Sequence, residues 1–266
     1  MNLCDYNTIR DLLARHGFHF SKSMGQNFLI DPEVPRRIAE ASGADAGCGV
    51  LEIGPGIGPL TAELAQRAGK VVAVELDRAL LPVLAETMAP YPNVEVVPGD
   101  VLKLDLTAIT AEKFQGLTPI VCANLPYNVT SPILEKLVES PCFTAFTVMI
   151  QREVARRLCA PQGSSEGGSF SLFLQYYMKP ELLFDVPPEK FLPAPKVTSA
   201  VIRCVRRGCS GRELFLQSDA GRLPAAAQDP GQQPLRRPAG DSQGIHPTGH
   251  RRYGPACRRP GGTADA

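Results

Sequence analysis

The sequence lacks several features by which whole classes of protein are recognised. It has no run of about 18 apolar residues, which excludes a membrane-spanning helix. Its eight cysteines include no CxxC pair and its four histidines do not have zinc-finger spacing, so neither a disulfide framework nor a zinc site is expected. The first 17 residues carry charges where a secretory signal needs an apolar stretch. We therefore expect a cytoplasmic protein with reduced cysteines.

The net charge is small, but charge and composition are unevenly distributed. The chain has 28 Lys+Arg against 27 Asp+Glu, a formal net charge of +1, so it is not strongly basic. Residues 216–266 hold seven arginines, four aspartates, eight glycines and seven prolines, and no lysine, glutamate, valine or phenylalanine. Glycine and proline at this density, without a period, are typical of disordered chain. Only the slightly acidic residues 1–215 have the composition of a folded core.

Short apolar runs alternate with amphipathic segments through much of the chain. This alternation predicts βαβ units and an α/β fold, a Rossmann-like parallel sheet with helices on both faces. Asp31 is expected to cap a helix whose first residue is Pro32. The predicted strands are 49–53, 70–75, 94–97, 118–123, 143–150, 181–184 and 197–205. The predicted helices are 8–16, 32–42, 59–68, 78–88, 132–139 and 169–178, and the pattern changes after residues 154–158.

Three segments after successive predicted strands carry the residues of a nucleotide site. The turn LEIGPGIG, residues 51–58, lets the backbone at Gly54 and Gly56 approach a ligand at a helix N-terminus. Glu75 ends the next strand, where an acid can bind ribose hydroxyls or can simply be a solvated strand end. Asp100 follows the third strand, where it can accept a bond from an adenine amino group. The turn alone fits NAD, FAD or S-adenosylmethionine enzymes, or a simple tight turn. The second acid favours S-adenosylmethionine.

The fourth of these strands ends in the segment Asn124-Leu125-Pro126-Tyr127. The amine on an aromatic base is a poor nucleophile because its lone pair is delocalised into the ring. The Asn124 side-chain carbonyl and the Leu125 backbone carbonyl can accept its two hydrogens and favour a more nucleophilic geometry. Pro126 shapes the turn, and Tyr127 offers a face on which a flipped-out base can stack. The alternative is an Asn-x-Pro turn that only ends a strand.

Taken together, these motifs resemble the bacterial ribosomal small-subunit RNA adenine dimethyltransferase family (KsgA type). The matching segments run in family order across residues 8 to about 207: SKSMGQNFLID, LEIGPGIGPLT, VELD, GD, NLPYNVTSPIL, MIQREVARRL and FLPAPKVTSAVIR. The resemblance implies a class I S-adenosylmethionine-dependent methyltransferase fold. It also implies that Asn27 and Leu29 contact the cofactor, together with Gly54, Glu75, Asp100 and Asn124. Phe191 is implied to sandwich the target adenine with Tyr127, although packing in a proline-rich hairpin explains Phe191 equally well.

The resemblance also implies the reaction and its partner. The expected function is transfer of two methyls from S-adenosylmethionine to each of two adjacent adenines, in a hairpin loop near the 3' end of small-subunit RNA. The implied partner is the pre-30S particle, and the protein is expected to be a monomer that needs no metal and no membrane. Two alternatives are a non-catalytic RNA-binding assembly factor and a large-subunit adenine methyltransferase of the macrolide-resistance type. Candidate RNA-binding residues are Arg36, Arg37, Arg152, Arg156, Arg157, Arg203, Arg206 and Arg207.

The resemblance stops at about residue 216, where the family continues into a helical domain. Suitable synonymous codons for residues 224–237, read one nucleotide later, encode a helix-compatible segment like that domain, and the same shift works for residues 243–263. This pattern favours a frameshift near Phe215, genuine or a sequencing or assembly error, over a natural basic tail. We predict a methyltransferase domain at 1–207, including an N-terminal extension, and an aberrant, disordered tail at 208–266.

Overall fold

The computed structural model of the chain describes residues 1–18 and 26–208. The tail predicted at 208–266, apart from Gly208, lies outside the described residues, so the domain boundary and the frameshift stay predictions. The strands are β1 (Phe28–Leu29), β2 (Cys48–Ile53), β3 (Lys70–Glu75), β4 (Val94–Pro98), β5 (Thr118–Asn124), β6 (Ala145–Gln151), β7 (Met178–Val186), β8 (Phe191–Leu192) and β9 (Ser199–Arg206). The α-helices are α1 (Tyr6–Arg15), α2 (Glu33–Ser42), α3 (Pro59–Ala65), α4 (Leu81–Met88), α5 (Leu106–Lys113), α6 (Thr130–Glu139), α7 (Arg152–Cys159) and α8 (Ser169–Tyr177), with short 3-10 turns at η2 (Arg78–Leu80), η3 (Tyr127–Val129) and η4 (Pro188–Lys190).

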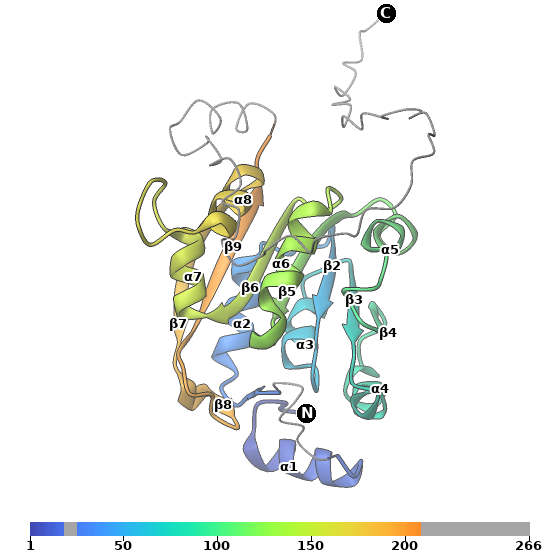
Figure 1. Cartoon of the computed structure of the whole chain (residues 1–266). Helices are drawn as coiled ribbons and strands as arrows, with labels where there is room; N and C mark the ends of the chain where they lie inside the picture. Colours follow the sequence, from blue (N-terminus) through green and yellow to red (C-terminus); the bar gives the residue numbers. More distant parts are fainter. Residues whose placement is uncertain (19–25, 209–266) are drawn as a thin grey trace, which may run out of the picture. The chain divides into compact units, whose positions relative to one another are not determined.

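Seven strands form one sheet in the order β4-β3-β2-β5-β6-β9-β7 (Figure 1). The strands from β4 to β6 are parallel, and β9 runs antiparallel to both β6 and β7. The chain proceeds outward from β2 to β4, then returns to β5 on the other side of β2 and proceeds to β6. The strand order therefore reverses between β2 and β5. A ligand crevice is expected beyond the carboxyl ends of the strands at such a point.

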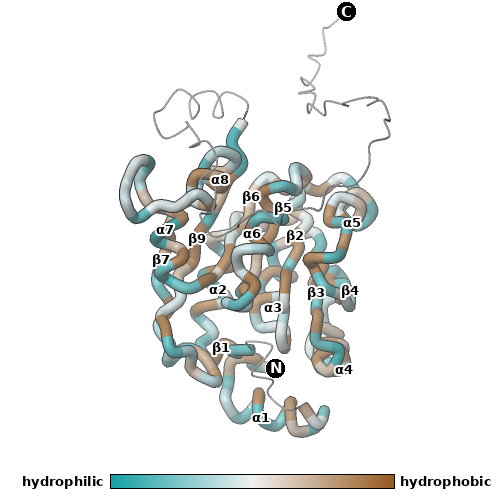
Figure 2. Tube along the Cα trace, viewed as in Figure 1, coloured by the Kyte–Doolittle hydropathy of each residue, from teal (hydrophilic) through white to brown (hydrophobic). Residues whose placement is uncertain are grey.

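Hydrophobic clusters cover both faces of this sheet, as predicted. Leu51 and Ile53 of β2 belong to a cluster that includes residues of α5, α6, α7 and α8. Val50, which points to the opposite face, packs in a cluster with residues of α2 and α3. A third cluster joins α1 to α4. Figure 2 shows the hydrophobic residues that recur along the central strands. No helix in the described part of the chain is long and apolar enough to cross a membrane.

Strands β1 and β8 were not predicted, β7 extends beyond the predicted strand 181–184, and three further local features differ from the sequence predictions. Helix α5 was not predicted, although Asp105 is a recognisable N-cap whose side chain accepts from the Ala108 N–H at 3.0 Å. The helix predicted at 78–88 divides into η2 and α4, because Pro82 has no N–H with which to continue an α-helix from Arg78. Helix α2 begins at Glu33 rather than at Pro32, and Asp31 still accepts from the Glu33 N–H at 2.9 Å.

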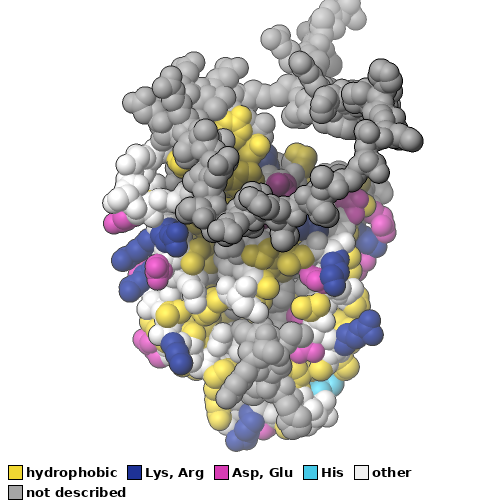
Figure 3. Space-filling view, viewed as in Figure 1, with side chains coloured by type: hydrophobic (Ala, Val, Ile, Leu, Met, Phe, Trp, Pro, Cys, Tyr) yellow, Lys and Arg dark blue, Asp and Glu magenta, His cyan; other side chains and the backbone are white. Residues whose placement is uncertain are grey.

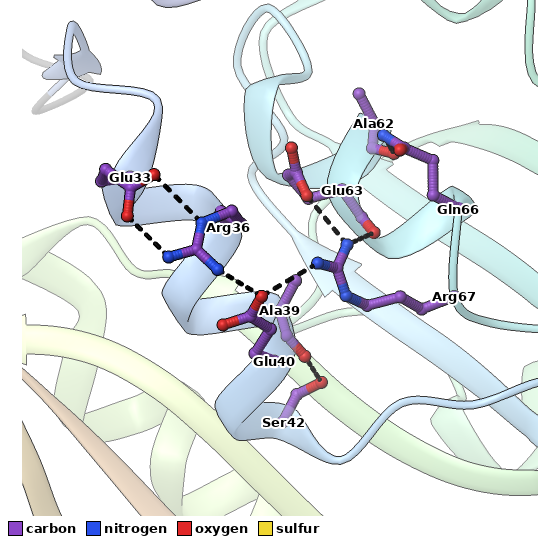
Figure 4. A network of polar contacts seen from close by, with 9 residues as sticks. All are labelled: Glu33, Arg36, Ala39, Glu40, Ser42, Ala62, Glu63, Gln66 and Arg67. Atoms are coloured by element: carbon purple, nitrogen blue, oxygen red, sulfur yellow. Dashed lines mark hydrogen bonds and ion pairs between the residues drawn. The ribbon is translucent and has the colours of Figure 1, made fainter.

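Charged side chains connect α2 to the end of α3 (Figure 4). Arg36 of α2 forms ion pairs with Glu33 and Glu40 of the same helix. Arg67 contacts Glu40 at 3.4 Å and Glu63 of α3 at 2.8 Å. The exposed pairs of Arg36 contribute about 0–1 kcal/mol each, so they add little to the stability of the fold.

Candidate active site

A cavity of about 230 Å³ lies at the carboxyl edge of the sheet, where the strand order reverses. Helix α1 and strand β8 lie beyond the same edge (Figure 1). Every site residue predicted from the sequence lines this cavity: Asn27, Leu29, Gly54, Gly56, Glu75, Asp100, Asn124, Leu125, Pro126, Tyr127 and Phe191. The carboxyl ends of adjacent parallel strands meet at one edge of a sheet, which is why residues so far apart in sequence gather here.

The glycines of the turn after β2 have different surroundings. Gly54, Gly56 and Gly58 all have positive φ angles, +67°, +63° and +94°, which favour glycine. A Cβ atom placed on Gly54 would meet nothing within 4 Å, whereas one on Gly58 would lie 2.5 Å from the Cε atom of Met88 in α4. Gly54 therefore leaves open space beside the cavity. At Gly58 the flexible end of Met88 could shift to admit a Cβ atom, so it is the φ angle of +94° that favours glycine.

Glu75 at the end of β3 is tied to the glycine turn. Its side chain is only 6% exposed, and burial raises the pKa of its carboxyl group. One carboxylate oxygen accepts from the Gly56 N–H at 3.3 Å, and the other accepts from the Asp77 N–H at 2.8 Å. Each carboxylate oxygen has a further lone pair, so the group can also accept hydrogen bonds from a ligand.

Asp100 after β4 presents a carboxylate with one oxygen engaged. Its Oδ1 atom accepts from the Leu102 N–H at 3.0 Å, which shapes the loop after the strand. The Oδ2 atom lies 3.7 Å from the Lys103 ammonium group, an exposed and weak ion pair. With 28% of its side chain exposed, Asp100 can accept a hydrogen bond from an amino group in the cavity.

The segment after β5 combines unpaired acceptors with an anchored aromatic ring. Among the described residues, neither the Asn124 side-chain amide nor the Leu125 carbonyl has a hydrogen-bond partner. The Pro126 carbonyl, by contrast, accepts from the Thr130 hydroxyl at 3.0 Å. The half-buried Tyr127 shares a 2.6 Å hydrogen bond with the Ser199 hydroxyl, and burial raises the pKa of the Tyr127 phenol.

The N-terminal segment and the proline-rich loop meet through β1 and β8. These two-residue strands pair antiparallel, with Leu29 opposite Phe191. The Lys190 ammonium group contacts the Asp31 carboxylate at 2.6 Å and lowers the pKa of that carboxyl. Phe191 is 3% exposed and belongs to a core cluster, yet it also lines the cavity. Both interpretations that the sequence left open, core packing and contact with a ligand, therefore remain compatible with its position.

Sequence reasoning missed several residues of this cavity. The Gln26 side chain donates to the Asp77 carboxylate at 2.7 Å and so joins the N-terminal segment to the end of β3. Leu76, beside Glu75, is 56% exposed and lines the cavity. Glu52 of β2 is 1% exposed, and burial raises its pKa to about 8. Gln26 lies in the motif SKSMGQNFLID, and Leu76 and Asp77 lie in the motif VELD, so the motifs included these residues. The motifs did not indicate which of their side chains meet.

Most candidate RNA-binding arginines have intramolecular partners. Arg206 donates to the carbonyls of Leu137, Val138, Ser140 and Phe143, and Arg207 to those of Gln175 and Met178. Arg36 is in the network of Figure 4, Arg37 lies over the Phe184 ring, Arg152 pairs with Asp185, and Arg203 is half-buried. Arg156 and Arg157 are exposed on α7. On the face shown in Figure 3, Lys and Arg are interspersed with Asp and Glu rather than gathered in a patch.

The strand order, the antiparallel β9 and the residues that converge on the cavity define a class I S-adenosylmethionine-dependent methyltransferase fold. Two solved structures resemble it, each with a TM-score of 0.61. The 23S rRNA methyltransferase ErmE is 33% identical over 68% of this chain and 70% of that one. A dimethyladenosine transferase from Plasmodium falciparum is 28% identical over 70% of this chain and 65% of that one.

Sequence comparison identifies the family. Residues 17–211 match the model of the ribosomal RNA adenine dimethylases. Over 215 residues the chain is 50% identical to the ribosomal RNA small subunit methyltransferase A of Geobacillus thermodenitrificans, covering 78% of this chain and 73% of that protein. The corresponding protein of Alkaliphilus oremlandii is 48% identical over 195 residues, which are 73% of this chain and 68% of the relative. The chain belongs to the ribosomal RNA adenine dimethylase family.

Proposed function

We propose that this protein transfers methyl groups from S-adenosylmethionine to the 6-amino groups of two adjacent adenines in a hairpin loop near the 3' end of small-subunit rRNA. The observation that carries the proposal is the convergence of Gly54, Glu75, Asp100 and Asn124 on one cavity at the point where the strand order reverses. The first three residues suit a nucleoside, and the fourth suits an aromatic amine. Identities of 48–50% to small-subunit methyltransferases support this choice of rRNA.

The residues around the cavity fit the cofactor. The open space over Gly54 admits a ligand against the backbone, and the buried Glu75 carboxylate is held by two backbone N–H groups in position to accept from ribose hydroxyls. The exposed Leu76 side chain offers apolar contact to a purine ring. Asp100 accepts from the adenine amino group, and Asn27 and Leu29 close the far side. When bound, S-adenosylmethionine supplies a methyl group on a sulfonium, which needs no further activation.

Asn124 and Leu125 act on the target amine. The Asn124 side-chain carbonyl and the Leu125 backbone carbonyl, which have no partners among the described residues, accept its two hydrogens. These bonds localise the nitrogen lone pair and direct it into the cavity. The Leu125 N–H donates to the Met149 carbonyl of the neighbouring strand β6 at 3.1 Å. This bond holds the backbone between Asn124 and Leu125, from which the two accepting carbonyls project.

Tyr127 and Phe191 hold the target base. A base is reachable in RNA only where it is unstacked, as in a loop, and aromatic side chains recognise its face. Tyr127 presents a ring from the turn after β5, and Phe191 presents one from β8, both at the cavity. The protein acts as a cytoplasmic monomer on the pre-30S particle. The exposed Arg156 and Arg157 on α7 are the candidates for phosphate contact.

Methyl transfer to isolated ribosomal subunits tests this proposal. The full chain is incubated with labelled S-adenosylmethionine and with small or large subunits from a strain that lacks these methylations. We expect label in the small subunit alone. Label in the large subunit alone would favour the large-subunit alternative, for which the similarity to the 23S rRNA methyltransferase ErmE is the specific observation. Binding to small subunits without any transfer would favour a non-catalytic assembly factor.

A further inference from the structure

A hydrogen bond joins Tyr127 to a residue from a distant part of the chain. The Tyr127 hydroxyl and the Ser199 hydroxyl lie 2.6 Å apart, although 72 residues separate them in sequence. Ser199 is completely buried, and Tyr127 is half-buried. Ser199 belongs to the segment FLPAPKVTSAVIR, to which the proposed function assigns a role only for Phe191.

Ser199 is paired to a strand on each side, whereas Tyr127 is not part of the sheet. Ser199 is the first residue of β9 and pairs with Gln151 of β6 on one side and with Val186 of β7 on the other. The preceding residue, Thr198, accepts from the Arg152 N–H at 3.0 Å. Tyr127, by contrast, lies in the short 3-10 turn η3 that follows β5. The bond therefore ties a ring on a turn to a hydroxyl inside the sheet.

The bond restrains the position of the tyrosine ring. A tyrosine attached only at its Cβ atom can swing about two side-chain torsions. A second attachment at the hydroxyl, at the opposite end of the ring, fixes the direction of the ring's long axis and therefore the place that the ring occupies at the cavity. Burial raises the pKa of the Tyr127 phenol, so the pair retains a proton to share at neutral pH. A buried hydroxyl without a partner is unfavourable, and within the described residues each hydroxyl in this pair has the other.

We propose that Ser199 is a positioning residue, whose hydroxyl holds the Tyr127 ring in the position where the target adenine stacks on it. The inference rests on the proposed function, because it assumes that Tyr127 receives the base. Ser199 would thus support RNA binding through Tyr127, without touching the RNA itself. Ser199→Ala and Tyr127→Phe remove the same hydrogen bond from opposite ends while the ring stays, so the two variants should behave alike.

The test compares Ser199→Ala, Tyr127→Phe and the double variant in the full chain. For each, S-adenosylmethionine Kd is measured by calorimetry and kcat/KM with small subunits by labelled methyl transfer. We expect both single variants to lose about fivefold in kcat/KM, equivalent to about 1 kcal/mol, with an unchanged cofactor Kd. The kcat/KM of the double variant should be no lower than that of the less active single variant, because all three variants lose the same hydrogen bond. Ser199→Thr, which retains a hydroxyl, should recover most of the activity.

Ser42→Ala is the matched control for the loss of a buried serine hydroxyl. Ser42 is 2% exposed, and its hydroxyl donates to the Ala39 carbonyl at 2.6 Å on α2, outside the cavity. This variant should keep the wild-type kcat/KM. Wild-type kinetics in both Ser199→Ala and Tyr127→Phe, or additive losses in the double variant, would overturn the inference. If Ser199→Ala does not fold, Tyr127→Phe decides alone. A wild-type chain without methyl transfer would instead refute the proposed function.

Discussion

Replacing Glu75 by glutamine should weaken cofactor binding by an amount that follows from its hydrogen bonds. Both carboxylate oxygens accept backbone N–H groups, from Gly56 and from Asp77, so the amide of Glu75→Gln must direct its NH₂ group toward one of these donors. The two proposed bonds to ribose hydroxyls also lose their charge, at about 1 kcal/mol each. The sum is about 2 kcal/mol, or a roughly 30-fold higher Kd.

Isothermal titration of S-adenosylmethionine into wild-type and variant protein measures this change. Glu95→Gln is the matched control, because Glu95 lies on β4 outside the cavity and pairs with Lys70 and Lys113. Its Kd should equal that of the wild type. Since burial raises the pKa of Glu75, wild-type affinity should also fall as the pH is lowered, and the fall should begin at a higher pH than for an ordinary glutamate. A Glu75→Gln variant that binds within threefold of the wild type would refute the assignment.

Two further predictions concern the stability of the folded chain. Burial raises the pKa of Glu52 to about 8, whereas a glutamate in the unfolded chain has a pKa of about 4.3. Between these pH values the folded protein holds a proton that the unfolded chain releases. The free energy of unfolding should therefore fall as the pH rises through this range. Urea unfolding at several pH values should show that Glu52→Gln lessens this fall by up to about 1.4 kcal/mol per pH unit, and equal slopes would contradict the assignment. Arg206→Ala should lower the free energy of unfolding by about 2–4 kcal/mol, because four backbone carbonyls lose a charged donor. Arg10→Ala, which removes only an exposed pair with Asp11, should change it by less than about 1 kcal/mol, and equal effects of the two variants would count against a structural role for Arg206.

The sequence allowed the site residues to be predicted because their positions follow from topology. Gly54, Glu75, Asp100 and Asn124 each end or follow a parallel strand, and parallel strands carry such residues to one edge whatever the packing elsewhere. The strands themselves were predicted from their apolar runs, which are continuous because both faces of the sheet are covered. The resemblance to a family added Asn27, Leu29 and Phe191, which no periodicity would have selected.

Contacts between distant side chains could not be predicted in this way. The Tyr127–Ser199 bond depends on the antiparallel placement of β9 beside β6, and the sequence indicates a strand there but not its neighbours. The arginines show the same limit, since an RNA-binding residue and one that binds backbone carbonyls, such as Arg206, look identical in sequence. Helix α5 was missed because its buried positions, Leu106 and Thr110, make only a weak apolar pattern.

The most direct test of the account is an analysis of the nucleosides produced on small-subunit RNA. Small subunits that lack the methylation are incubated with S-adenosylmethionine and either the wild-type chain or Asn124→Ala, and the RNA is digested and analysed by mass spectrometry. Cofactor Kd is measured for both proteins in parallel. We predict two N6,N6-dimethyladenosines per RNA with the wild type, and at least a hundredfold lower rate with Asn124→Ala, on the order of the loss of one oxyanion-type contact. A wild-type chain that binds S-adenosylmethionine but produces no dimethyladenosine, or an Asn124→Ala variant as fast as the wild type, would contradict it.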